Sequence, residues 1–434
     1  MKRVVSLCFL FFAVANVNAQ NLTLDEAINI ALKNSLDIEI AQNTYEANRI
    51  NNHLAMAGGL PEVSGSLTDN QSLTNLNQKL SNGTTTKRNG NSNNALNAGI
   101  EASFLLYNGN RVRYTKSRLG AIERQSAEDI NLQIQNLVAS VMIKYYDIIR
   151  QAGYVTTIQQ SIDVTLQRKK LIDARQEVGL ANNADSYQAR LDLTAAQQEL
   201  RSQALILDQA KADLLSLLTL RPDSAITVRD TIIVDRNVSI AAVRENLRNN
   251  PAFLAADQQI LINELIEKEI GARRYPSVSL NGGYNYVRSQ NAAGFTLLNQ
   301  NFGPFIGFGL QIPIFNGGVT RRQQQIAAID TRNAERVRQT VLNDLESQAV
   351  KAWMSYQNSL ERLEAEKENN RIAADLLTLV QQRFQLGVGT TVDLREAQRS
   401  FVEAGFRLVN LSYAAKVAEV ELKRLSGQLP LRVQ

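Results

Sequence analysis

The feature that most constrains this chain of 434 residues is an internal duplication with a spacing of 208 positions. The stretch GLANNADSYQARLD at 179–192 and the stretch GVGTTVDLREAQRS at 387–400 carry glycine, aspartate and alanine at matching places. The tripeptide YNG at 107–109 recurs at the same spacing as FNG at 315–317. A period this long indicates a tandem repeat of one structural unit. The chain is therefore predicted to fold as two similar halves.

The N-terminal sequence has the pattern of a secretory signal peptide. Lys2 and Arg3 are followed by an apolar run at 4–14 and by a small-residue cleavage site that ends at Ala19. The run is short for a transmembrane helix, so we expect cleavage after Ala19 and export. The only cysteine, Cys8, lies inside this leader, so we expect no disulfide and no cysteine metal site in the mature chain.

The repeat and the leader together define the predicted organisation of the chain. We expect a signal peptide at 1–19, a first repeat at 20–220, a linker or equatorial region at 221–238, a second repeat at 239–427 and a C-terminal tail at 428–434. Each repeat is predicted to contain a helix, two strands, a long helix, a turn and a returning helix.

The distribution of proline permits unusually long helices. None of the seven prolines lies in 62–221 or in 314–429, and proline breaks helix interiors. We expect long helices at 110–180 and at about 318–386, each roughly 100 Å long at about 1.5 Å per residue. Gly179 and Gly387 follow them, where a helix end favours a left-handed residue.

The returning helices carry a heptad pattern that predicts coiled-coil packing. In the second repeat, apolar residues recur at spacings of three and four, and eight of the ten matching positions in the first repeat are also alanine or leucine. The positions in the second repeat are Leu394, Ala397, Phe401, Ala404, Leu408, Leu411, Ala415, Ala418, Leu422 and Leu425.

Four segments alternate between apolar and small or polar residues and are predicted to be strands: 61–71, 95–107, 276–288 and 302–314. Residues 77–94 and 289–300 are predicted to be polar loops between them. Four strands cannot close round a lumen, and open edges in lipid are costly, so a membrane sheet of this kind needs further copies. The alternative is a soluble sandwich with the apolar face buried on a helix.

At this point the sequence resembles the outer-membrane efflux family, the TolC-like channels. The matching motifs are LTLDEAI at 22–28, YNG at 107–109, FNG at 315–317 and GVGTTVDL at 387–394 followed by Ala397 and Gln398. The resemblance implies a mixed α and β fold: a homotrimer with a 12-stranded outer-membrane β-barrel, four strands per chain, continued by a long periplasmic α-helical coiled-coil barrel.

The resemblance also implies a function, a location and partners. The chain would be the outer-membrane channel of a tripartite efflux or secretion system, with a periplasmic extension in a Gram-negative type of envelope. It would give a passive exit duct for drugs, small molecules or proteins. Its partners would be outer-membrane lipid, a periplasmic adaptor (membrane fusion) protein and an inner-membrane transporter; we expect no nucleic-acid partner.

The same resemblance assigns roles to residues of the two hairpins. Asp393, Glu396 and Asp185 would narrow and gate the pore. Gly179, Leu180, Gly387, Val388, Gly389 and Thr390 would form the hairpin tips on which the adaptor docks. The family often carries a basic residue where this chain has Gly389, and a hydroxyl-bearing aromatic residue where it has Phe384. The sequence therefore does not show which contacts hold the tip closed.

Other classes of function find little support in the sequence. The single histidine, His53, lies among polar residues, and no catalytic triad, phosphate-binding loop or metal motif is present, so we expect no enzyme and no cofactor. A periplasmic coiled-coil scaffold or adaptor without a barrel is the alternative, and the outer component of a one-step protein secretion system is a third reading.

Overall fold

The computed structural model describes residues 20–179 and 181–429, which form two compact units. The hairpin unit contains residues 20–41, 130–253 and 342–429 of this described chain, and the sheet unit contains 42–129 and 254–341. The predicted signal peptide, Leu180 and residues 430–434 lie outside the described residues.

The long helices match the prediction and repeat with equal lengths. Both α3 (Arg111–Glu177) and α7 (Val319–Gln385) contain 67 residues, and both α4 (Asn183–Leu217) and α8 (Thr391–Leu425) contain 35. The shorter helices are α1 (Leu24–Asn34), α2 (Leu36–Asn51), α5 (Ile240–Asn246), the 3-10 turn η1 (Leu247–Asn249) and α6 (Pro251–Ala272). None of the helices in 20–179 and 181–429 combines the length and apolar character needed for a membrane span.

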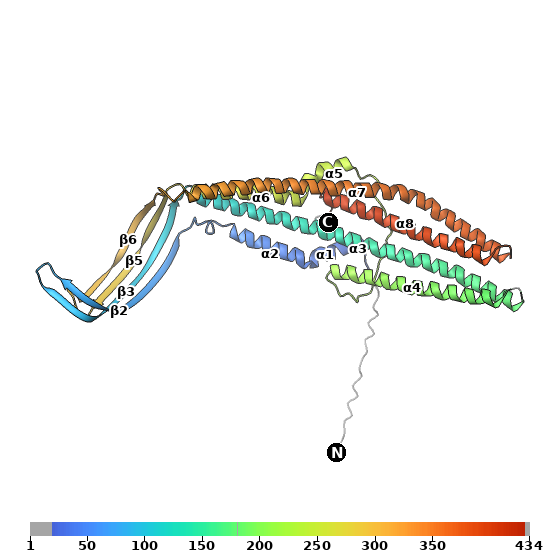
Figure 1. Ribbon diagram of the computed structural model, residues 1–434, viewed down its shortest axis with the longest axis horizontal. Helices are drawn as coiled ribbons and strands as arrows, with labels where there is room; N and C mark the ends of the chain where they lie inside the picture. Colours follow the sequence, from blue (N-terminus) through green and yellow to red (C-terminus); the bar gives the residue numbers. More distant parts are fainter. Residues whose placement is uncertain (1–19, 180, 430–434) are drawn as a thin grey trace, which may run out of the picture. The chain divides into compact units, whose positions relative to one another are not determined.

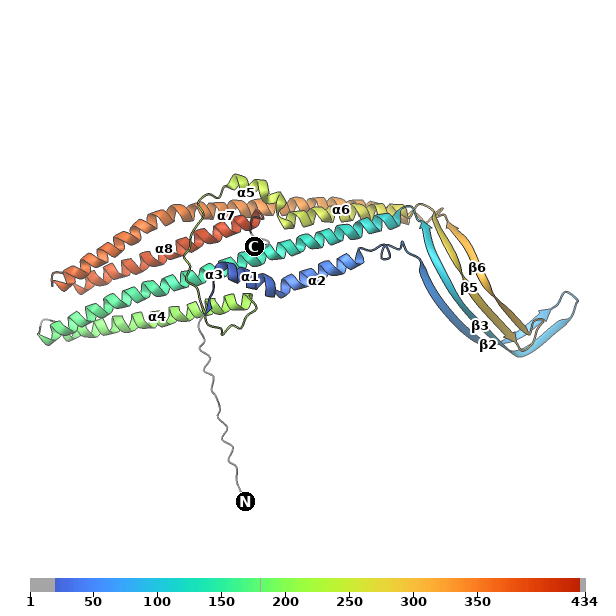
Figure 2. The ribbon, with the colours of Figure 1, turned by 180° about the vertical axis from the view of Figure 1, so that it is seen from behind.

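In the hairpin unit, α7, α8, α3 and α4 lie side by side in that order (Figures 1 and 2). Eight of the ten predicted heptad positions on α8 are buried, which confirms the seam. On α4, four of the ten equivalent positions are buried: Ala189, Gln203, Ala210 and Leu214. The inner helix α8 is thus well packed, and α4 retains apolar surface that the unit does not cover.

The core of the hairpin unit is centred on Tyr145 of α3, which is fully buried. Its hydroxyl donates to the carbonyl of Leu22 at 3.0 Å and also contacts the Asp230 carboxylate. The short strands β1 (Gln20–Asn21) and β4 (Ile226–Thr227) pair in parallel beside it. These contacts fix part of the 221–238 segment against α3.

The same segment also contacts α8 through buried charges. Glu419 is 1% exposed and accepts from the Asp235 amide at 2.9 Å. Lys423 bridges Glu419 at 2.8 Å and Asp235 at 3.1 Å. A buried carboxylate is tolerated only when it is paired in this way, so the network holds 221–238 in a defined position.

The sheet unit contains one antiparallel sheet in the order β2-β3-β5-β6 (Figure 1). Its strands are β2 (Glu62–Lys79), β3 (Thr85–Tyr107), β5 (Ser277–Asn291) and β6 (Leu298–Gln311). The predicted loops were wrong in extent, because β2 and β3 continue as a paired ribbon through most of 77–94, and β5 and β6 take up part of 289–300. This ribbon is mostly polar, and a bulge between Thr74 and Leu76 interrupts its alternation.

The strand register places the large apolar side chains on one face. Leu67 is opposite Ala98, and Tyr286 is opposite Phe302, in one continuous row. On the edge strand β6, Phe302, Ile306, Phe308 and Leu310 are all more than 60% exposed. The other face carries mostly Ser, Asn and Gly. The sheet therefore has one apolar and one polar face, with free edges at β2 and β6.

Candidate functional site at the helical hairpins

The two hairpin turns are built by the residues that the sequence singled out. Gly179 has φ 77° and Gly387 has φ 82°, the left-handed region in which glycine carries no steric penalty. The two returning helices, α4 and α8, begin with different capping interactions. Asn182 accepts from the amide of Asp185 at 2.8 Å, whereas Thr390 and Asp393 form a reciprocal capping box.

Gly389 has a structural reason to be glycine. A Cβ at this position would lie 3.0 Å from the backbone nitrogen of Phe384 and 3.3 Å from the carbonyl carbon of Arg383. The turn is folded tightly against the end of α7, where the Val388 and Gly389 amides both donate to the carbonyl of Arg383. Any side chain at this position would therefore crowd the turn through its Cβ.

Of the three predicted constriction carboxylates, Asp185 and Asp393 lie in the first turns of α4 and α8, and Glu396 lies one turn further along α8. Hydrogen bonds from Thr390 hold the pKa of Asp393 below its ordinary value. Glu396 is 61% exposed and pairs with Arg399 of the same helix at 2.6 Å. The sequence prediction of a purely acidic pair therefore missed the neighbouring cation. Asp185, on the other hairpin, is half-buried.

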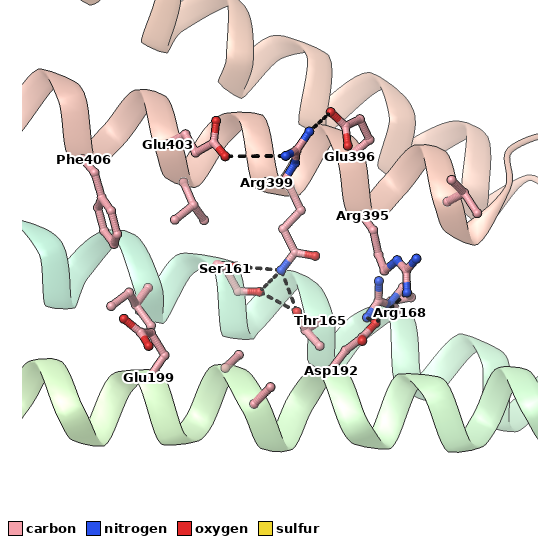
Figure 3. Close-up of a pocket in the computed structure, with 16 residues that line it drawn as sticks. Ser161, Thr165, Arg168, Asp192, Glu199, Arg395, Glu396, Arg399, Glu403 and Phe406 are labelled. Atoms are coloured by element: carbon pink, nitrogen blue, oxygen red, sulfur yellow. Dashed lines mark hydrogen bonds and ion pairs between the residues drawn. The ribbon is translucent and has the colours of Figure 1, made fainter.

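An ion-pair cluster joins the two hairpins close to their tips. Arg168 of α3 is 3% exposed and pairs with Asp192 of α4. Arg395 of α8 approaches the same carboxylate at 4.0 Å. Burial lowers the pKa of the Arg168 guanidinium, and Asp192 opposes that shift. Figure 3 shows the three side chains converging where α3, α4 and α8 meet.

Two further contacts tie the hairpins together. The Gln398 amide of α8 is buried and donates to the Ser161 and Thr165 hydroxyls of α3, both at 2.6 Å. Arg175 of α3 donates to the Phe384 carbonyl at 2.7 Å, and its guanidinium carbon lies 5.0 Å from the centre of the Phe384 ring. The aromatic residue without a hydroxyl is thus engaged by a cation from the opposite hairpin.

The Asp192 cluster and the Gln398 hydrogen bonds border a groove of about 740 Å³ between α4 and α8, with α3 as its floor. The groove carries both signs of charge, with Arg168, Arg395 and Arg399 facing Asp192, Glu199, Glu396 and Glu403 (Figure 3). Among the described residues, no cluster of three or more His, Cys, Asp or Glu side chains is placed to hold a metal ion.

Sequence reasoning did not identify Arg168, Asp192, Arg175 or Arg395 as part of this site. Each resembles a solvated charge on a helix face when read locally, and each finds its partner on another helix. Long paired helices joined to a sheet with one exposed apolar face are typical of membrane-associated proteins that extend far from the bilayer.

Comparisons with known proteins give the family. The profile described as "Outer membrane efflux protein" matches residues 27–219 and 242–428, and the chain belongs to this family. It is therefore an outer-membrane efflux protein with a TolC-like fold and a periplasmic extension. The comparisons give no support to a scaffold or adaptor without a membrane sheet.

The chain is similar to several known members. It is 26% identical to outer membrane protein TolC of Vibrio cholerae over 353 residues, 77% of each chain. It is 21% identical to outer membrane efflux protein BepC of Brucella suis, covering 94% of this chain and 86% of the relative. The crystal structure of outer membrane protein VceC from Vibrio cholerae superposes with a TM-score of 0.77 at 18% identity, covering 93% of this chain and 96% of VceC.

Proposed function

We propose that three copies of this chain assemble into a passive export conduit across the outer membrane. The observation that carries the proposal is the four-stranded sheet with one apolar face and two free edges. Free edges in lipid leave backbone groups without hydrogen bonds, so β2 of one copy must pair with β6 of another. Three copies supply twelve strands, enough to surround a channel.

The hairpin unit supports the same assembly. The outer helices α4 and α7 expose apolar side chains, including Leu191, Leu205, Ile372 and Leu379, each more than 50% exposed. In a closed ring, α4 of one copy packs against α7 of the next and covers these residues. The helices then continue the barrel as a periplasmic tunnel.

The hairpin tips form the gate of this tunnel. Asp393, Glu396 and Asp185 line its narrowest part, and the tip residues 179–180 and 387–390 receive a periplasmic adaptor protein coupled to an inner-membrane transporter. The Asp192 cluster, the Gln398 hydrogen bonds and the Arg175–Phe384 contact hold the two hairpins of one copy together. Opening has to separate groups that are buried in the closed arrangement. The conduit itself carries out no chemical step, and the transporter supplies the energy.

Single-channel recording in planar bilayers tests the proposal. The wild-type protein should form channels that prefer cations, because rings of carboxylates repel anions. Substituting Asp393→Ala together with Glu396→Ala should weaken that preference and the block by multivalent cations. Absence of channels would contradict the conduit, whereas channels of unchanged selectivity would remove these two residues from the constriction.

A further inference from the structure

Six exposed arginines lie at one end of the sheet, where strands and long helices meet. Arg111 and Arg113 begin α3 directly after β3, Arg273 and Arg274 lie between α6 and β5, and Arg321 and Arg322 are in the first turn of α7 after β6. Figure 1 shows these three junctions at the same end of the sheet. All six belong to the sheet unit, and we call them the arginine collar.

Acidic residues are absent from the sequence around the collar. No Asp or Glu occurs in 102–122 or in 270–329. Arg273 and Arg274 donate to the neutral side chains of Gln323 and Gln324. At this end of the sheet unit, Glu62 begins β2 and Glu269 is paired with Arg118 at 2.9 Å, so the six arginines of the collar still carry an excess of positive charge.

The positions of four of these arginines oppose the local electrostatics of the helices. A helix N-terminus carries partial positive charge, so cations in the first turn are unfavourable. Other helices of the chain have the favourable charge at this end: α1, α2, α4 and α8 all have acidic residues in the first turn. Only at α3 and α7, among the helices of the described chain, do arginines occupy that turn. A local conflict repeated in both halves indicates a function outside the helix.

The neighbouring aromatic residues point to a membrane surface. Tyr107 is 44% exposed, Tyr275 is 59% exposed and Phe315 is 88% exposed, and all three are at the same strand ends. Exposed aromatic side chains at the ends of membrane strands belong at the level of the lipid headgroups. Guanidinium groups bind phosphate with paired hydrogen bonds, and anionic lipid surfaces attract basic residues.

We infer that the arginine collar binds the phosphate groups of anionic phospholipids in the periplasmic leaflet of the outer membrane. The inference rests on the proposal that the sheet crosses that membrane. Bound headgroups would supply the negative charge that the first turns of α3 and α7 lack, so lipid binding and helix stability are coupled. The collar thereby fixes how deeply the sheet sits in the bilayer.

The test uses the full-length protein in a neutral detergent, with phosphatidylglycerol or phosphatidylcholine added. The variants are Arg321→Gln with Arg322→Gln, and Arg273→Gln with Arg274→Gln. Arg288→Gln is the control, because it removes one arginine near the other end of β5, and its effect is compared with half of the effect of each double variant on the binding free energy. Retained lipid phosphorus and the melting temperature are measured for each protein.

Phosphatidylglycerol should raise the melting temperature of the wild type and of the control, and should bind each double variant about 25-fold more weakly, from about fivefold per arginine. Without lipid, the Arg321/Arg322 variant should melt no lower than the wild type, because its first turn is relieved of unfavourable charge. Misfolding is thereby separated from loss of lipid binding.

Equal responses of the variants and the wild type to phosphatidylglycerol would overturn the inference, as would an equal effect of phosphatidylcholine. Reproduction of the effect by inorganic phosphate would also overturn it, because the site would then bind free anions. Channel recording keeps the two claims apart. Variants that conduct normally but show unchanged lipid binding contradict only the collar, whereas a wild type without channels contradicts the conduit.

Discussion

Truncation of Asp192 gives the sharpest test of how the two hairpins are held together. Its carboxylate is 22% exposed, and it is the ion-pair partner of Arg168, whose side chain is 2% exposed. Asp192→Ala leaves that guanidinium buried and unpaired, and losing one partner of a buried ion pair costs about 3–5 kcal/mol. The lower value, about 3 kcal/mol, applies here because Asp192 borders an open groove.

The effect of Asp192→Ala on gating is a separate and smaller quantity. Arg168 and Asp192 belong to the same hairpin, so their pair stabilises the fold of that hairpin. The link of Asp192 to the other hairpin is the Arg395 contact at 4.0 Å, and losing up to about 1 kcal/mol there shifts the closed-to-open equilibrium by at most about fivefold toward the open form. In bilayer recordings, Asp192→Ala should therefore raise the ratio of open to closed time by up to about fivefold relative to the wild type. The variant should also melt at a lower temperature.

The matched control is Asp208→Ala on the same helix. Asp208 pairs with Lys211 at 2.9 Å but is 70% exposed, so the pair contributes less than about 1 kcal/mol. It should leave both conductance and melting temperature nearly unchanged. If Asp192→Ala lowered the melting temperature but conducted like the wild type, the cluster would be a structural contact that stays intact during opening, and the reasoning would fail.

Three further substitutions test the tip and the core. Gly389→Arg should loosen the turn, because a Cβ at this position would lie 3.0 Å from the backbone nitrogen of Phe384; faster hydrogen exchange at the tip would show this. Thr390→Val should raise the pKa of Asp393 toward its ordinary value, measurable by carboxyl NMR. Because the pKa of Asp393 is lowered in the folded protein, its ionised carboxylate stabilises the wild type at pH values above the ordinary aspartate pKa. This stabilisation is lost as the pH falls through the folded-state pKa, and the variant should lose this pH dependence. Tyr145→Phe removes the buried hydrogen bond to Leu22 and should cost about 1–3 kcal/mol in thermal or denaturant unfolding.

Local periodicity explains why so much of the fold could be predicted. Heptads, strand alternation and runs without proline can each be seen within the sequence of a single element. They predicted α3, α4, α7 and α8 to within a few residues. The ribbon formed by 72–79 and 85–94 was missed because it is mostly polar and a bulge between Thr74 and Leu76 interrupts the alternation, so backbone pairing defines it.

Within the candidate site, the sequence predicted only those residues whose type is fixed by the geometry of a turn. Gly179 and Gly387 follow from helix-end geometry, whereas the capping role of Thr390 was not predicted. The Arg168–Asp192 pair joins two helices across a hairpin, and Arg175 reaches Phe384 in the other repeat. Such contacts depend on how the helices are aligned along one another, which a heptad pattern does not specify.

The measurement that tests the central claim most directly is the mass of the detergent-purified mature protein, corrected for bound detergent. The account predicts three times the mass of one chain, because three four-stranded sheets close one barrel without free edges. A stable monomer would leave the edges of β2 and β6 unpaired and would contradict the conduit.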